Sequence, residues 1–113
     1  MTVTIPPGPV FGTLEAIPSK SAAHRLLICA ALAEGETFVR CDRTSQDIDA
    51  TIRCLIGMGA GVVREKEGYR VRPVRRGDIP SPCTLDCGES GSTLRFLLPM
   101  VCALGADGSF RMA

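Results

Sequence analysis

The sequence predicts an α/β domain of the α+β kind, in which helices and short strands follow one another along the chain. Apolar residues recur at helical spacing in three segments, and short runs of strand-forming residues bounded by Gly or Pro separate these segments. The chain has 113 residues, 45% of them hydrophobic, which is enough for the core of one domain. Only 4% are aromatic, so we expect a core of small aliphatic side chains.

The first elements expected are a strand, a helix and a second strand. Residues 10–17 alternate roughly between apolar and polar side chains, and Pro18 ends the run. The pattern then predicts a helix over residues 21–33 with Gly35 as its C-cap. A short strand over residues 36–41 follows.

A second helix has a clear start and a clear apolar face. Thr44 and Ser45 offer an N-cap. Asp47 lies in the first turn, where a negatively charged carboxylate interacts favourably with the helix dipole. Glycines between residues 57 and 61 close the helix. The apolar residues at helical spacing are Ile48, Ile52, Leu55 and Ile56.

The remainder of the chain predicts a hairpin over residues 62–71, a Pro-rich connection and a strand over residues 83–87. A third helix is expected from Gly91–Ser92, and a last strand over residues 109–112. The first six elements are therefore in the order β-α-β-α-β-β, and the strand over residues 83–87, a helix and a last strand follow, so we expect a fragment in which a second unit begins. The apolar stripe of the third helix is Leu94, Leu97, Leu98 and Val101, with Pro99 loosening one turn.

Composition excludes several classes of function. The formal net charge is +1, which gives no overall field for nucleic acid or an anionic membrane. The longest uncharged apolar stretch, residues 96–106, is too short to span a bilayer. The N-terminus lacks the pattern of a signal peptide, so we expect a cytoplasmic protein with reduced cysteines. Cys29, Cys54 and Cys102 are expected to pack as small hydrophobes.

No metal site is expected. His24 is the only histidine, and Cys83 and Cys87 have no second Cys or His pair at zinc spacing. His24 is expected to pack or to form local hydrogen bonds.

The start of the first helix indicates an anion site. Backbone N–H groups at a helix N-terminus are unpaired and carry partial positive charge. Lys20, Ser21 and Arg25 would converge there, as an ammonium, a hydroxyl and a guanidinium. Because a cation at a helix N-terminus opposes the dipole, we expect a bound oxyanion to compensate Lys20.

The other two helix starts are less specific. Ordinary capping is the favoured interpretation of Thr44–Ser45, and Asp47 is either a dipole-stabilising carboxylate or an acid/base group facing the same cleft as Lys20. The segment 87–95 resembles a phosphate-binding loop in composition, with Gly91 allowing close backbone approach and Arg95 one turn further on. It lacks the Gly-Lys-Ser/Thr ending of a Walker A loop.

Three blocks together resemble the family of 5-enolpyruvylshikimate-3-phosphate (EPSP) synthases. They are Ser19-Lys20-Ser21-Ala22-Ala23-His24-Arg25, then Thr44-Ser45-Gln46-Asp47-Ile48, then Gly88-Glu89-Ser90-Gly91-Ser92-Thr93-Leu94-Arg95-Phe96. The resemblance implies two domains built from repeated βαβαββ units that close over a cleft. Residues 1–17 would be a leading strand segment of the other domain of the full-length protein. Residues 18–113 would hold the first βαβαββ unit and the start of a second, incomplete domain.

The resemblance also implies a reaction without a cofactor. The enolpyruvyl group of phosphoenolpyruvate is transferred to the 5-hydroxyl of shikimate 3-phosphate and phosphate is released, in the shikimate pathway of aromatic amino-acid biosynthesis. The full-length protein would be a cytoplasmic monomer, without nucleic-acid or membrane partners. The chain alone is expected to be inactive, because most acid/base groups would lie elsewhere in the protein.

Site residues carried over from the family fall at the three helix starts. Lys20 matches the lysine that contacts both substrates. Lys20 and Asp47 together match the catalytic positions. Ser21 and Arg25 match residues that hold shikimate 3-phosphate. The positions that match the phosphoenolpyruvate side are Gly91, through its backbone, Arg95, and Glu89, which stands where an asparagine is frequent.

Two alternatives stay open at this point. One is the sister enolpyruvyl transferase that acts on UDP-N-acetylglucosamine, which typically has Lys-Asn where this chain has Lys20-Ser21. The other is a non-enzymatic βαβ RNA-binding module, although the near-neutral charge and the scarcity of aromatic residues disfavour it.

Overall fold

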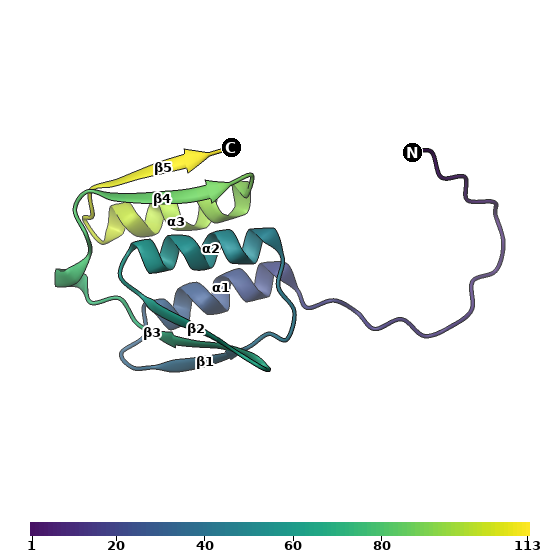
Figure 1. Ribbon diagram of the computed structural model, residues 1–113, viewed down its shortest axis with the longest axis horizontal. Helices are drawn as coiled ribbons and strands as arrows, with labels where there is room; N and C mark the ends of the chain where they lie inside the picture. Colours follow the sequence, from purple (N-terminus) through teal and green to yellow (C-terminus); the bar gives the residue numbers. More distant parts are fainter.

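The computed structural model describes residues 1–113 as a body of helices and strands preceded by an extended N-terminal segment (Figure 1). Residues 1–19 contain no helix or strand, so the strand predicted over residues 10–17 is wrong for this chain. A strand needs a neighbour for its backbone hydrogen bonds, and no other strand pairs with this segment. Its large apolar side chains are exposed, including Phe11 at 89%.

From residue 20 onward the predicted order of elements is confirmed. The only addition is a short 3-10 helix, η1, within the Pro-rich connection. The helices are α1 (Lys20–Ala31), α2 (Gln46–Gly57) and α3 (Gly91–Ala103), and η1 covers Arg76–Asp78. The strands are β1 (Thr37–Arg40), β2 (Gly61–Glu65), β3 (Gly68–Arg72), β4 (Cys83–Gly88) and β5 (Gly108–Met112).

The strands form two small sheets with the helices between them (Figure 1). The first sheet has the antiparallel order β1-β3-β2, with the predicted hairpin as β2 and β3. In the second sheet β4 and β5 are parallel and α3 connects them. Because α2 packs against both β4 and β2, it ties the two sheets together.

One position in the first sheet leaves no room for a side chain. Gly68 begins β3 and lies opposite Arg40 of β1. A Cβ atom at Gly68 would lie 2.1 Å from the carbonyl oxygen of Val39 and 2.9 Å from the backbone nitrogen of Cys41. The close approach of β1 to β3 at this end of the sheet therefore depends on glycine.

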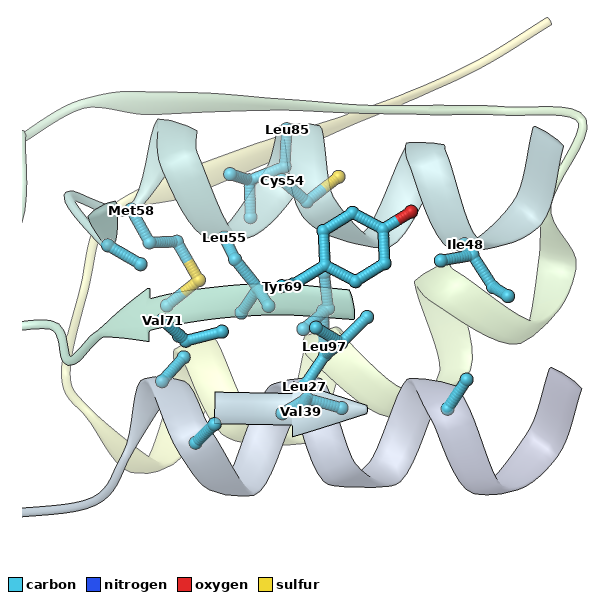
Figure 2. Close-up of a cluster of buried hydrophobic side chains, with 14 of the residues drawn as sticks. Leu27, Val39, Ile48, Cys54, Leu55, Met58, Tyr69, Val71, Leu85 and Leu97 are labelled. Carbon is cyan, nitrogen blue, oxygen red and sulfur yellow. The ribbon is translucent and has the colours of Figure 1, made fainter. Parts of the chain in front are cut away.

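The core consists mainly of small aliphatic side chains, as the composition predicted. Figure 2 shows Leu27 of α1, Leu55 of α2 and Leu97 of α3 directed into the same cluster as strand side chains. Tyr69 is the one aromatic residue among the buried hydrophobics. The other large, fully buried apolar side chains are Met58, Val71 and Leu85.

The predicted apolar stripes are correct in part. Ile48 and Leu55 are buried, but Ile56 is 49% exposed and Leu98 is 47% exposed. Each exposed residue directly follows a fully buried leucine, and one residue is a rotation of about 100° around a helix. The buried faces of α2 and α3 are therefore narrower than the apolar pattern predicted.

The helix ends also differ in one respect from the prediction. Ser45 caps α2 as expected, and its hydroxyl accepts from the N–H of Ile48. Gly35 does not cap α1, because that helix ends at Ala31 and its C-cap is Leu32, whose N–H donates to the carbonyls of Ile28 and Cys29. No left-handed residue is needed there, and Gly35 lies in the bend that follows.

All six cysteines are free thiols, but their burial differs from the prediction. Cys54 is buried, whereas Cys29 and Cys102 are exposed because they lie on the outer faces of α1 and α3. None of the three helices has the length and apolar character required to cross a lipid bilayer.

Candidate active site

All three helices begin at the same end of the body (Figure 1). Their N-caps are Ser19, Ser45 and Ser90, and each hydroxyl accepts a backbone N–H from its own first turn. The remaining N–H groups at each start are without helical partners, and the partial positive ends of the three dipoles add together. This end of the molecule is therefore suited to bind anions.

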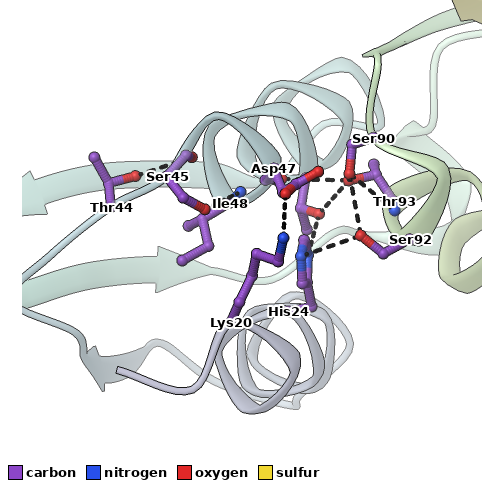
Figure 3. Close-up of polar contacts among 10 residues, drawn as sticks. Lys20, His24, Thr44, Ser45, Asp47, Ile48, Ser90, Ser92 and Thr93 are labelled. Atoms are coloured by element: carbon purple, nitrogen blue, oxygen red, sulfur yellow. Dashed lines mark hydrogen bonds and ion pairs between the residues drawn. The ribbon is translucent and has the colours of Figure 1, made fainter. Parts of the chain in front are cut away.

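Lys20 and Asp47 form an ion pair at this end, between the first turns of α1 and α2 (Figure 3). The ammonium Nζ lies 2.5 Å from Oδ2 of Asp47. The Lys20 side chain is 54% exposed and that of Asp47 is 28% exposed, so both remain accessible from solvent. Two cavities of about 460 and 500 Å³ lie beside the pair, the first lined in part by Lys20 and the second by Asp47.

This contact corrects the expectation that only a bound oxyanion offsets the charge of Lys20. The Asp47 carboxylate compensates the lysine within the chain itself. The Lys20 ammonium and then the Ser90 hydroxyl hold the pKa of Asp47 below its ordinary value. Asp47 is therefore an ionised partner of Lys20 at neutral pH. It lies beside Lys20, as its predicted acid/base role requires, and that role itself stays a prediction.

Ser21 and Arg25 are brought together on the next turn of α1. The guanidinium of Arg25 donates to the hydroxyl and to the backbone carbonyl of Ser21. Its Cζ atom lies 5.0 Å from the centre of the Phe96 ring of α3, a cation–π distance that fixes the side chain between the two helices. Lys20, Ser21, His24 and Arg25 all lie in the first two turns of α1.

The turn before α3 is accessible at its backbone. A Cβ atom at Gly91 would meet no other atom within 4 Å, although the Gly91 N–H already donates to the carbonyl of Glu89 at 3.1 Å. The N–H of Ser92 makes no hydrogen bond within the chain, so it is free to donate. At this turn, the N–H of Ser92 is therefore better placed than that of Gly91 to donate to an anion.

Glu89 and Arg95 are not in contact with the Lys20–Asp47 pair. Both are exposed and make no ion pair within the chain. Glu89 lines the larger cavity together with Asp47 and Arg53. Arg95 lies one turn beyond Gly91 and its guanidinium remains unpaired, so it is available to a ligand.

A buried polar network lies behind the site, and the sequence pattern did not predict it. His24 is 1% exposed, and its Nδ1 lies 2.6 Å from the Thr51 hydroxyl, which lies 2.8 Å from the Thr93 hydroxyl (Figure 3). His24 does form hydrogen bonds, as predicted, but between helices and not locally. A signal was present, because Thr51 lies on the apolar stripe of α2 between Ile48 and Leu55, where a polar residue needs a buried partner.

The burial of His24 has a consequence for stability. Burial is the main cause that lowers the pKa of His24, Lys20 and Arg25 lower it further, and Asp47 opposes them. The imidazole is therefore neutral in the folded chain at neutral pH, whereas in the unfolded chain it titrates near 6.5. Between those two pKa values the unfolded state binds more protons than the folded state.

We therefore expect the free energy of unfolding to fall as the pH drops below about 6.5, by up to about 1.4 kcal/mol per pH unit. Urea denaturation between pH 5 and pH 8 measures this dependence. The His24→Asn variant serves as the control, because it lacks the only imidazole of the chain and keeps every other titratable group. Equal pH dependence in the two proteins would contradict the buried, neutral histidine.

Comparison with known proteins shows which family the chain resembles. The model of the EPSP synthase (3-phosphoshikimate 1-carboxyvinyltransferase) family matches residues 5–112. The chain is 41% identical over 113 residues to the 3-phosphoshikimate 1-carboxyvinyltransferase of Clostridium botulinum strain Eklund 17B, covering 96% of this chain and 26% of that protein. It is 40% identical over 112 residues to the enzyme of the same name from Methanosphaerula palustris, covering 93% of this chain and 26% of that protein.

A solved structure gives the same result for the fold. The EPSP synthase from Acinetobacter baumannii superposes with a TM-score of 0.67 at 27% identity, over 80% of this chain and 21% of that one. The chain thus spans about a quarter of the length of the relatives that it matches. Because the family model matches nearly the whole sequence, the chain belongs to the EPSP synthase family.

Proposed function

We propose that this chain supplies one wall of the active site of a 3-phosphoshikimate 1-carboxyvinyltransferase. In that reaction the 5-hydroxyl of shikimate 3-phosphate attacks the enol carbon of phosphoenolpyruvate, and phosphate leaves. The observation that carries the proposal is the convergence of three helix N-termini around the Lys20–Asp47 pair. Both substrates are small phosphorylated anions, which this end of the molecule is suited to bind.

Shikimate 3-phosphate is assigned to the α1 side of the site. The Ser21 hydroxyl and the Arg25 guanidinium are in contact, and together they offer a donor pair to a phosphate. The Phe96 ring limits the movement of Arg25, so less conformational entropy is lost when the guanidinium binds. Lys20 lies on the preceding position of the same helix and extends toward α2.

Phosphoenolpyruvate is assigned to the space between Lys20 and the turn before α3. The free N–H of Ser92 and the open backbone at Gly91 suit a carboxylate or phosphate oxygen. Arg95 supplies a further cation from the same helix. Glu89 must be turned away from this ligand, because an ionised carboxylate beside it would repel the anion.

The catalytic contribution of this wall is positioning and charge neutralisation. Two crowded anions react only when their charges are offset and the reacting atoms are held close together. Lys20 and Arg25 provide that charge, and Asp47 orients the Lys20 ammonium. We expect the chain by itself to bind substrate without turning it over, because it holds the ligands from one side only. The exposed apolar segment 1–17 is assigned to a neighbouring domain.

The two alternative functions have no observation in their favour. Every named relative above is a 3-phosphoshikimate 1-carboxyvinyltransferase and none acts by name on a nucleotide sugar. Arg64 and Arg70 on the hairpin, which a nucleic-acid surface would need to be free, are engaged within the chain. Arg64 donates to the carbonyls of Cys41 and Asp42, and Arg70 pairs with Glu65.

The test is a titration of the chain with shikimate 3-phosphate, in which NMR monitors the signals of the chain. We expect shifts at Ser21, Arg25 and Gly91, and at least about 100-fold weaker binding in the Lys20→Ala/Arg25→Ala double variant, since each lost charged hydrogen bond costs about 1.5–3 kcal/mol. The Arg40→Ala/Lys66→Ala variant removes the same two charges from the first sheet and its hairpin turn and should bind normally. The proposal fails if millimolar ligand leaves the three signals of the unsubstituted chain unmoved.

A further inference from the structure

The polar network behind the site joins all three helices. Its members are His24 of α1, Thr51 of α2 and Thr93 of α3, with exposed fractions of 1%, 0% and 0%. Burying a hydroxyl or an imidazole is unfavourable unless it is hydrogen-bonded, and apolar residues of similar shape would fill the same space without that requirement. A network whose members are all satisfied specifies one arrangement of the elements that carry it.

The hydrogen bonds form a continuous chain from one helix to the next. Nδ1 of His24 bonds the Thr51 hydroxyl, and that hydroxyl bonds Thr93 at 2.8 Å. The Thr93 hydroxyl can donate to the Ser90 hydroxyl at 2.8 Å or to the backbone carbonyl of Asp47 at 3.3 Å. Nε2 of His24 faces the Ser92 hydroxyl at 3.4 Å. The network therefore ends at the cap and first turn of α3 and at the backbone of Asp47.

The members lie directly behind the residues of the site. His24 is four residues after Lys20, and Thr51 is four residues after Asp47, so each is one helical turn deeper on the same side of its helix. Thr93 is two residues after Gly91. The network therefore holds the helices together one turn below the points from which Lys20, Asp47 and the Gly91 turn project.

The bonding pattern is consistent with a neutral imidazole. A neutral ring has one donor and one acceptor nitrogen, and each hydroxyl donates once. With Nδ1–H donating to Thr51, the bonds run from Thr51 to Thr93 and on to Ser90, while Nε2 accepts from Ser92. The reverse direction would require the Thr93 hydroxyl to donate to Thr51, and its donation to Ser90 or to the Asp47 carbonyl would then be lost. The observed pattern requires both threonine hydroxyls.

We propose that His24, Thr51 and Thr93 are positioning residues, which fix the separation of the Lys20–Asp47 pair from the α3 turn and so preorganise the anion site. The identity of the ligand in this inference rests on the proposed function. The placement of the Lys20–Asp47 pair relative to the α3 turn does not depend on it. If the hydroxyl link between α1, α2 and α3 is lost, α1 and α2 can shift relative to each other and the Lys20–Asp47 contact is loosened. Sub-ångström placement is what an anion site of this kind depends on.

The test uses Thr51→Val, which removes the hydroxyl at nearly constant shape, and Thr51→Ser, which keeps it. The first measurement is the pKa of the Asp47 carboxyl, determined by NMR. Because Lys20 is the main cause of its lowered pKa, loosening the pair should raise this pKa in Thr51→Val and not in Thr51→Ser. The second measurement is the affinity for shikimate 3-phosphate, which we expect to fall about tenfold in Thr51→Val and to be restored in Thr51→Ser.

A control separates positioning from stability. Val71→Ala removes a fully buried side chain from β3, in the first sheet, and should destabilise the chain without changing either measurement. If Thr51→Val does not fold, Thr93→Val and His24→Asn interrupt the same network at other links and take its place. An unchanged Asp47 pKa in folded variants would overturn the inference. If the unsubstituted chain does not bind shikimate 3-phosphate, the proposed function fails, and the Asp47 measurement still decides the positioning role.

Discussion

Replacing Gly68 by alanine is expected to destabilise the chain by about 3 kcal/mol or more, at the upper end of the cost of overpacking. The new Cβ would lie 2.1 Å from the carbonyl oxygen of Val39 and 3.0 Å from the Cα of Arg40. These are backbone atoms, so no side chain can rotate away to relieve the contact. The paired residues of β1 and β3 must separate instead, with loss of their hydrogen bonds. Urea denaturation followed by circular dichroism measures the effect.

Gly35→Ala is the matched control for this prediction. A Cβ at Gly35 meets no atom within 4 Å, and its backbone does not have a positive φ angle. Alanine there should leave the free energy of unfolding within about 0.5 kcal/mol of the original value or raise it slightly, because it restricts the unfolded chain. Equal stability of the Gly68 and Gly35 variants would show that β1 and β3 do not approach as closely as described.

Truncating Leu55 to alanine is expected to cost about 2–5 kcal/mol. The Leu55 side chain is 0% exposed and projects from α2, the helix that packs against both sheets. Its removal leaves a cavity lined by the neighbouring side chains of the core. A close-packed interior can collapse onto such a cavity only in part. The same denaturation experiment measures the loss.

Ile56→Ala is the natural comparison, because it removes a side chain of equal size from the next position of α2. Ile56 is 49% exposed, so its truncation should cost less than about 1 kcal/mol. The pair of variants also tests the narrow buried face of this helix. Similar losses at the two positions would mean that Ile56 packs against the core after all.

The sequence predicted most elements of the body because their signals are local. Serine caps, apolar residues at helical spacing and the charged hairpin turn each lie within a few residues of the structure that they specify, so α2 and the β2–β3 hairpin were found correctly. The strand over residues 10–17 failed for the opposite reason. Its pattern of side chains is suitable, but strand pairing needs a partner that nothing in the local pattern supplies.

For the candidate site, the sequence suggested members but not their contacts. Matching motifs proposed Lys20, Ser21 and Asp47, but the ion pair between Lys20 and Asp47 joins residues 27 positions apart, and no spacing rule for one helix can predict it. The hydroxyl contact between Thr51 and Thr93 spans 42 positions. Such contacts arise from how the helices pack against each other. A polar residue on an apolar stripe is the one local sign of them.

The contact between Lys20 and Asp47 means that the lysine already has an anion before any ligand arrives. In the proposed function, a ligand oxyanion would share the Lys20 ammonium with this tethered carboxylate, since an ammonium has three hydrogen-bond donors. The exposed pair is itself worth about 1 kcal/mol or less, so it opposes ligand binding at Lys20 only weakly. The same tethered carboxylate keeps the lysine extended into the site when no ligand is bound, so the ligand finds it in place.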